Sequence, residues 1–134
     1  MTGVQTCALP ISSVGLFGIA FADAKHGLAV GGDYSIRRGP SDFALESFDG
    51  GTTWKRTASR PDGTTQGLAL IPLSIPPSFV AVGAHGSAFT RDFGATWTYG
   101  DTNTVWGVGF VGPNTGWAVG ARGRMMKFGI FPAK

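Results

Sequence analysis

Two aspartates occupy the same place in a repeated eight-residue pattern, S/T-x-D-x-G-x-T-W, and carboxylates can serve as catalytic acids and bases or as metal ligands. A single active site has no need of two copies at equivalent positions of a repeat, so we interpret both aspartates as structural. A short Asp side chain can accept hydrogen bonds from the backbone of a turn, and the glycine supplies the φ that the turn requires. The residues of the pattern are Ser47, Asp49, Gly51, Thr53 and Trp54, then Thr90, Asp92, Gly94, Thr96 and Trp97.

Glycoside hydrolysis is one enzymatic function that carboxylates support. It requires two carboxylates flanking one bond, and sialidases use an arginine cluster with a tyrosine nucleophile. Glu46 is the only glutamate, and Tyr34 and Tyr99 are the only tyrosines. The chain therefore holds at best part of such a site, and a fragment of a sialidase-like glycoside hydrolase stays the alternative function.

Other patterns of catalytic type have simpler structural explanations. Residues 107–112 match G-x-G-x-x-G, which binds dinucleotides where a helix opens at the last glycine, but Pro113 and the residues after it predict a turn. His26 and His85 each precede a glycine in a predicted turn, and no third ligand stands at a metal-binding spacing. We therefore assign no catalytic residue, no cofactor and no metal ligand.

Four arginines form a possible interaction surface: Arg37, Arg38, Arg122 and Arg124. A guanidinium group can pair with carboxylates and stack on aromatic rings, and arginine is enriched at protein interfaces. Ordinary solvated loop charge is the alternative interpretation. The segment 33–43 is longer than a tight hairpin and is a second candidate for recognition, because function concentrates in loops on rigid scaffolds.

Charge and hydropathy exclude two classes of partner. The net charge is only +3, from 11 Lys and Arg against 8 Asp and Glu, and no cationic run is present. We therefore expect no nucleic-acid partner. No stretch reaches the roughly 18 apolar residues of a membrane span, so we expect no transmembrane segment. A protein partner or another, unidentified ligand is what remains.

Three aligned copies of a two-strand unit supply the elements that position these residues. The copies run from Phe17 to Gly31, from Gln66 to Gly83 and from Trp106 to Gly120. In each copy two runs of strand-like composition flank a turn, which is typical of a β-hairpin. We expect the third copy to have a further strand at 124–128. The strands predicted for the first unit, including the two around its aspartate pattern, are 16–21, 27–32, 43–47 and 54–57.

Composition agrees with an all-β chain. There are 22 glycines, a single glutamate and only 14% charged residues. Long solvated helices need more charge than this, whereas tight turns between strands use glycine freely.

The aspartate pattern resembles the Asp-box, or BNR repeat, of β-propellers. The resemblance implies an all-β propeller fragment with Asp-box hairpins: two four-stranded blades, at about 15–57 and 66–99, and a partial third at 105–131. Propellers typically have 4–8 blades, so we expect further blades outside this sequence. The resemblance also implies equivalent packing for Trp54 and Trp97.

Residues 13–131 are also similar to the photosystem II stability/assembly factor-like proteins. The similarity lies in the segments Gly31-Gly-Asp-Tyr34, Gly116-Trp-Ala-Val-Gly120 and Gly120-Ala-Arg-Gly-Arg124. It implies a non-enzymatic binding or assembly-factor role with a protein partner, in an extracytoplasmic location. The binding surface of that family does not carry over residue by residue.

The first eleven residues, 1–11, resemble a translated sequencing adapter and contain the only cysteine, Cys7. We therefore expect residues 12–134 to be the native part, forming the C-terminal part of the propeller. An open arc of blades leaves one sheet face bare at each end. The apolar residues expected to be uncovered there are Leu16, Phe17, Ile19 and Phe21 at one end and Val108, Phe110, Trp117 and Val119 at the other.

Overall fold

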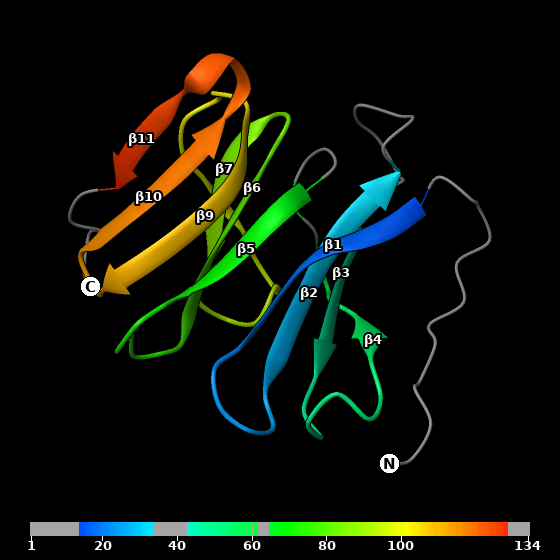
Figure 1. Ribbon diagram of the computed structural model, residues 1–134. Helices are drawn as coiled ribbons and strands as arrows, with labels where there is room; N and C mark the ends of the chain where they lie inside the picture. Colours follow the sequence, from blue (N-terminus) through cyan, green and yellow to red (C-terminus); the bar gives the residue numbers. More distant parts are fainter. Residues whose placement is uncertain (1–13, 34–42, 60, 62–64, 129–134) are drawn as a thin grey trace, which may run out of the picture.

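The described part of the chain forms three antiparallel sheets that stand side by side (Figure 1). The computed structural model describes residues 14–33, 43–59, 61 and 65–128, so residues 1–11 lie outside it. The first sheet contains β1 (Val14–Phe21), β2 (Gly27–Asp33), β3 (Phe43–Ser47) and β4 (Lys55–Arg56) in that order. The second contains β5 (Thr65–Ile71), β6 (Ser78–Gly83), β7 (Gly86–Thr90) and β8 (Thr98–Tyr99). The third contains β9 (Val105–Gly112), β10 (Thr115–Gly120) and β11 (Met125–Phe128), with the short 3-10 helix η1 (Ala121–Gly123) before β11.

The prediction of an all-β chain is confirmed, and none of the three sheets closes on itself. Most predicted strands agree with the observed ones to within two residues. β1 begins two residues earlier than predicted, at Val14, and β4, predicted at 54–57, is observed at Lys55–Arg56. Trp54 belongs instead to the turn before it, because its indole N–H donates to the Gly51 carbonyl oxygen at 3.0 Å.

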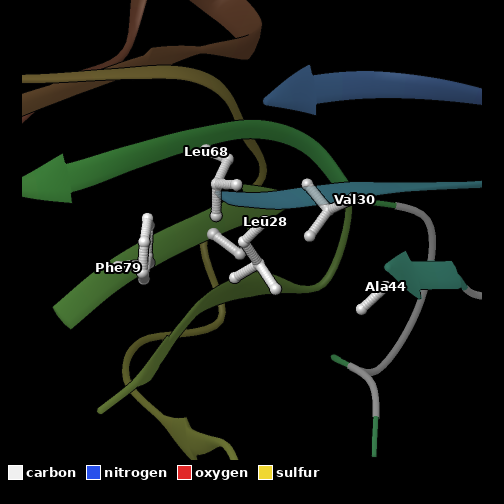
Figure 2. Packing of buried hydrophobic residues seen from close by; sticks show 6 residues of the cluster. Leu28, Val30, Ala44, Leu68 and Phe79 are labelled. Atoms are coloured by element: carbon white, nitrogen blue, oxygen red, sulfur yellow. The ribbon is translucent and has the colours of Figure 1, made fainter. Parts of the chain in front are cut away.

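The sheets pack face to face in chain order, so the second sheet has a neighbouring sheet on each of its faces. Successive side chains of a strand point to opposite faces. We call the face that points toward the next sheet in the chain the forward face, and the opposite one the rear face. Leu28 and Val30 of β2 lie on the forward face of the first sheet, where they meet Leu68 and Phe79 of the second (Figure 2). This first core cluster is completed by two small residues, Ala44 and Ala81.

A second core cluster joins the second and third sheets. Val80 and Val82 lie on the forward face of the second sheet and pack against Val105 and Ala118 of the third. All four are at most 2% exposed. The same positions of the repeated unit therefore build both interfaces.

The first strands of the three sheets, β1, β5 and β9, lie next to one another (Figure 1). Each has a register shift against its partner strand, at Phe17, Gln66 and Trp106, which are equivalent in the repeat. Each shift is a β-bulge, which sharpens the local twist and redirects a side chain. The glycine after the bulge permits close backbone approach. A Cβ at Gly18 would lie 2.9 Å from the Leu68 nitrogen, and one at Gly67 would lie 2.9 Å from the Trp106 carbonyl oxygen.

At the first-sheet end, the expectation about uncovered apolar residues is right for three of four. Leu16, Phe17 and Ile19 are 40%, 43% and 60% exposed. Phe21 instead packs edge-on against Trp54, with ring centroids 5.9 Å apart, because the turn after β3 folds back over it.

At the third-sheet end, the expectation is right for two residues and wrong for two. Trp117 and Val119 are 38% and 47% exposed. Val108 and Phe110 were expected to be bare but pack against the second core cluster. They lie on the rear face of β9, which the second sheet covers, whereas Trp117 and Val119 lie on the forward face.

Candidate interaction site

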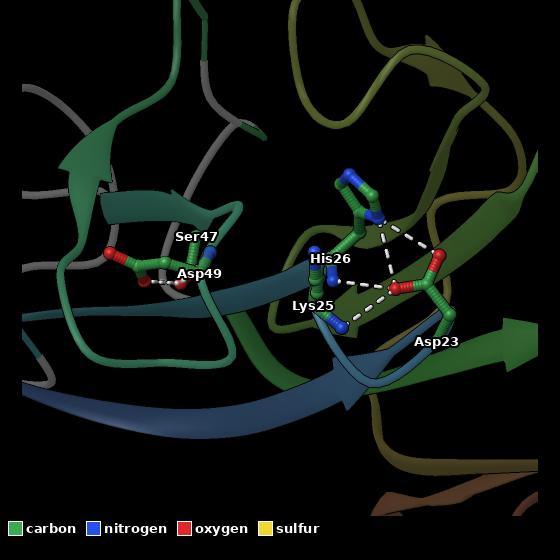
Figure 3. A network of polar contacts seen from close by, with 5 residues as sticks. All are labelled: Asp23, Lys25, His26, Ser47 and Asp49. Carbon is green, nitrogen blue, oxygen red and sulfur yellow. Dashed lines mark hydrogen bonds and ion pairs between the residues drawn. The ribbon is translucent and has the colours of Figure 1, made fainter.

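The first aspartate pattern forms a closed turn between β3 and β4. The Asp49 carboxylate accepts hydrogen bonds from the Thr53 backbone N–H at 2.9 Å and from the Thr53 hydroxyl at 2.6 Å. The Ser47 hydroxyl donates to Asp49 at 2.9 Å (Figure 3) and accepts the Gly51 N–H at 2.9 Å. The pattern therefore uses all of its polar side chains within a single turn.

The second pattern, between β7 and β8, repeats these bonds. The Asp92 carboxylate accepts the Thr96 backbone N–H at 2.9 Å and the Thr96 hydroxyl at 2.6 Å. The Thr90 hydroxyl donates to Asp92 at 2.8 Å and accepts the Gly94 N–H at 2.9 Å. Serine and threonine are interchangeable here because only the hydroxyl is used.

These bonds keep both carboxylates ionised. Hydrogen bonds from the Thr53 hydroxyl and backbone lower the pKa of Asp49 from 3.8 to about 2. Burial works to raise the pKa of Asp92, but the hydrogen bonds from Thr96 and Thr90 outweigh it, so this pKa is also lowered. A carboxylate that is ionised and engaged at both oxygens is poorly suited to donate a proton.

The two turns are neighbours, but their carboxylates serve separate turns. The rings of Phe48 and Phe93, which flank the two aspartates in sequence, lie 5.8 Å apart. A shallow depression beside Asp49 is lined by residues of the first turn and its flanking strands, and Asp92 is not among them. Asp49 and Asp92 therefore do not line a common pocket at this depression.

His26, which the sequence places in a turn, keeps 41% of its side chain exposed and lies beside both aspartate turns. Its ring lies 5.3 Å from that of Phe48 and 5.9 Å from that of Phe93. Its Nδ1 is 2.8 Å from an Asp23 carboxylate oxygen, and Asp23 also accepts the backbone N–H groups of Lys25 and His26 (Figure 3). These hydrogen bonds lower the pKa of Asp23 to about 2, and the bond from the Lys25 backbone N–H contributes most. Asp23 was not identified from the sequence. Its local signal is an aspartate at the start of a turn, whose side chain can accept hydrogen bonds from the backbone N–H groups two and three residues later.

The two turns and the β1–β2 turn together form what we call the aspartate-turn end of the molecule. The opposite end, which we call the bulge end, holds the three bulged residues, the β6–β7 turn and the β10–β11 turn. The strand register places these features at one end. In each sheet the residue before the bulge pairs with the last glycine of the second strand: Leu16 with Gly31, Thr65 with Gly83 and Val105 with Gly120.

Aromatic and basic side chains are exposed at the bulge end. Phe17 is 43% exposed and Trp106 is 50% exposed. Between them along the first strands lies Gln66, whose Oε1 is buried and has no hydrogen-bond donor among the described residues. Arg122 and Arg124 are both exposed in the β10–β11 turn. Arg122 has a left-handed backbone, with φ of 61°.

The four predicted arginines are only partly placed. Arg122 and Arg124 share one turn at the bulge end, whereas Arg37 and Arg38, with most of the candidate loop 33–43, lie outside the described residues.

A cleft of about 170 Å³ at the bulge end was not predicted. Its wall includes His85 of the β6–β7 turn, Ser87 of β7, and Asp101 and Thr102 from the segment after β8. The Ser87 hydroxyl donates to the Asp101 carboxylate at 3.2 Å, and the Ser87 N–H donates to the Asp101 carbonyl oxygen at 3.1 Å. The cleft arises because the segment after β8 folds back along β7, a long-range contact without a sequence signal of its own.

Within the described ranges there is no group of three or more His, Cys, Asp or Glu side chains that could hold a metal ion. No helix in that part of the chain is long and apolar enough to cross a membrane. Comparison with known proteins gives no match to a protein-family model and none to a curated protein sequence.

Proposed function

We propose that this chain is a non-enzymatic binding module, built as part of an Asp-box β-propeller similar to the photosystem II stability/assembly factor-like proteins. Three stacked antiparallel sheets with equivalent bulges and two identically bonded turns support the propeller assignment. The function is supported mainly by the side chains that the bulge end exposes. The repeated carboxylates are engaged at the aspartate-turn end, while the bulge end exposes aromatic and arginine side chains.

The bulge end suits a protein partner with an acidic and apolar surface. Trp106 lies on β9, which contributes Val105 to the second core cluster, and Phe17 lies on β1, whose Ala20 packs against the first, so little backbone ordering is needed on binding. Tryptophan and arginine are the residue types that most often carry binding energy at interfaces. Arg122 and Arg124 can pair with carboxylates of the partner through charge-assisted hydrogen bonds.

Glycoside hydrolysis, the alternative, gains no comparable support. It needs one protonated carboxyl and one carboxylate across a single bond. The lowered pKa values of Asp49 and Asp92 oppose the first role. Glu46, the only glutamate, lies on β3 opposite Lys55 of β4.

Binding can be tested with synthetic peptides rich in Asp, Glu and Leu, with lysine-rich peptides of equal length as the negative probe. We expect the acidic peptides to bind the full chain and quench tryptophan fluorescence, with an affinity that falls as salt is added. Changing Arg122 and Arg124 together to Ala should weaken binding by about tenfold or more, because hydrogen bonds to charged groups contribute about 1.5–3 kcal/mol each.

The matched control removes the same charge from the aspartate-turn end, by Lys25→Ala with Lys55→Ala. It should leave the affinity nearly unchanged. Equal losses in both double variants would mean non-specific charge attraction and would contradict the proposed site, as would failure of the acidic peptides to bind. Release of sialic acid from sialyllactose by the chain would instead favour the glycoside hydrolase.

A further inference from the structure

The forward face of the third sheet is equivalent to two faces that are buried in this molecule. Val119 of β10 occupies the position of Val30 and Val82, which are 0% and 1% exposed, yet Val119 is 47% exposed. Trp117 occupies the position of Leu28, which is fully buried, and is itself 38% exposed. The apolar surface that forms the two core clusters is thus present a third time without a cover among the described residues.

The backbone of the third sheet leaves room for a neighbouring strand. Gly107 follows the bulge of β9, as Gly18 and Gly67 follow theirs. At the two earlier positions an added Cβ would collide with the first strand of the next sheet, at 2.9 Å in both cases. At Gly107 the same Cβ would meet only Val119, at 3.4 Å, and at Gly109 it would meet nothing within 4 Å.

The rear face of the first sheet offers the complementary surface along β1. Ile19 is equivalent to Leu68, which is 9% exposed in the first core cluster, but is itself 60% exposed. Leu16 is equivalent to Val105, which is fully buried in the second cluster, but is itself 40% exposed. Ala29, on the same face of β2, is buried, so the open part of this face is β1 itself, the strand position that contacts the preceding sheet in both internal interfaces.

We propose that the forward face of the third sheet binds the rear face of the first sheet in a second copy of this chain. The new contact continues the two existing interfaces: β9 of one copy lies beside β1 of the next, as β5 lies beside β1 and β9 beside β5 within the chain. Trp117 and Val119 cover Leu16 and Ile19 of the second copy. Such head-to-tail contacts are heterologous, so they form a ring if the rotation closes and an open assembly if it does not.

Sedimentation velocity with the full chain tests this contact at increasing protein concentration. We expect species larger than one chain whose proportion rises with concentration. Val119→Lys and Ile19→Lys should each abolish association, because each places a charge in the apolar contact. Leu73→Lys is the matched control; Leu73 is 85% exposed in the β5–β6 turn, off both faces, so this variant should associate like the parent chain.

Mixing the two blocked variants tests the head-to-tail geometry directly. The Val119→Lys chain keeps an intact rear face, and the Ile19→Lys chain keeps an intact forward face, so an equal mixture should form a dimer and nothing larger. A parent chain that stays monomeric at every concentration overturns the proposal. Association of the Ile19→Lys chain alone overturns it too, because the rear face would then be unnecessary.

Circular dichroism of each variant is the control that tests whether its β structure is kept. Where a lysine variant does not fold, Val119→Thr or Ile19→Thr replaces it, since threonine keeps the β-branched side chain that suits a strand. These milder variants should weaken association several-fold, and unchanged association in both of them contradicts the proposal.

Discussion

The two aspartate turns share one local structure but differ in their surroundings. The four hydrogen bonds of Asp49 and its turn recur at Asp92 with distances within 0.1 Å of each other (2.9 and 2.8 Å for the Ser or Thr hydroxyl donor). The second turn, however, is also bound by the chain that leaves the first sheet. The Ser59 N–H and hydroxyl both donate to the Gly94 carbonyl oxygen, at 3.2 and 3.1 Å, and the Thr57 methyl group lies where a Cβ at Gly94 would point.

Two residues inside the turns show the same contrast. Gly50 follows the first aspartate, whereas Phe93 follows the second and packs its ring 5.4 Å from that of Phe79 in the core. The Trp54 indole N–H donates to a carbonyl oxygen in its own turn, whereas the buried Trp97 Nε1 has no hydrogen-bond partner in the described part of the chain. Local sequence builds the turn, and the place of the turn in the stack decides what else touches it.

The largest difference is expected between Gly94→Ala and Gly51→Ala. Both glycines have left-handed φ, +85° and +88°, so both variants incur a backbone cost of about 1–2 kcal/mol. Only at Gly94 would the new Cβ collide, lying 2.7 Å from the Thr57 methyl carbon; at Gly51 the nearest atoms are 3.5 Å away. Gly94→Ala should therefore lose about 1–3 kcal/mol more in the free energy of unfolding, measured in urea. Equal losses of unfolding free energy in the two variants would mean that the close approach of Thr57 does not restrict the side chain at position 94.

The next effect concerns the residue after each aspartate. Phe93 has φ of 54°, so its packing against Phe79 is gained at a backbone cost. Phe93→Ala should destabilise the chain by about 2 kcal/mol through lost packing. Phe93→Gly loses the same ring but removes the cost, so it should be about 1 kcal/mol more stable than the Ala variant. At Gly50, with φ of +75°, Gly→Ala should be destabilising. A Gly variant at 93 no more stable than Ala would contradict this account.

The tryptophans give a smaller contrast. Trp54→Phe removes the 3.0 Å bond to the Gly51 carbonyl oxygen and should cost about 1 kcal/mol. Trp97→Phe removes a buried N–H that has no partner among the described residues, so it should be close to neutral or stabilising. Thermal unfolding of the two variants measures the difference. A greater loss at Trp97 than at Trp54 would refute this assignment.

The smallest effect is on the pH dependence of stability. Because the folded state lowers the pKa of Asp49 from 3.8 to about 2, it favours the ionised form. That stabilisation is complete above about pH 4 and is lost as the pH falls through about 2. Asp49→Asn keeps an oxygen acceptor for Thr53 but has no charge to titrate, so it should flatten the fall in the urea midpoint over this range. Asp92→Asn should act in the same direction, since its pKa is lowered too.

Asp23→Asn is the matched control for this titration. Its pKa is also lowered to about 2, by bonds in a different turn. The effects of Asp23→Asn and Asp49→Asn on the slope should therefore add. An unchanged slope in the Asp49 variant would show that its carboxylate does not stabilise the folded state.

The strands and the interior of each aspartate turn follow from local sequence. Apolar residues two apart, as in Leu28 and Val30, specify a strand with one buried face. The bonds of Asp49 and Asp92 join residues two to four positions apart, so the chain needs no distant partner to form them. For this reason two copies with different surroundings have the same hydrogen bonds.

Which of the equivalent residues are covered depends instead on how the sheets pack against one another. Val82 and Val119 have the same place in the repeat, but the third sheet covers Val82, whereas Val119, in the third sheet itself, is 47% exposed. For the same reason Val108, which was expected to be bare, packs against the second core cluster. A strand pattern specifies that one face is buried, but the neighbour that buries it is set by the order in which the sheets stack, which no interaction between adjacent residues encodes.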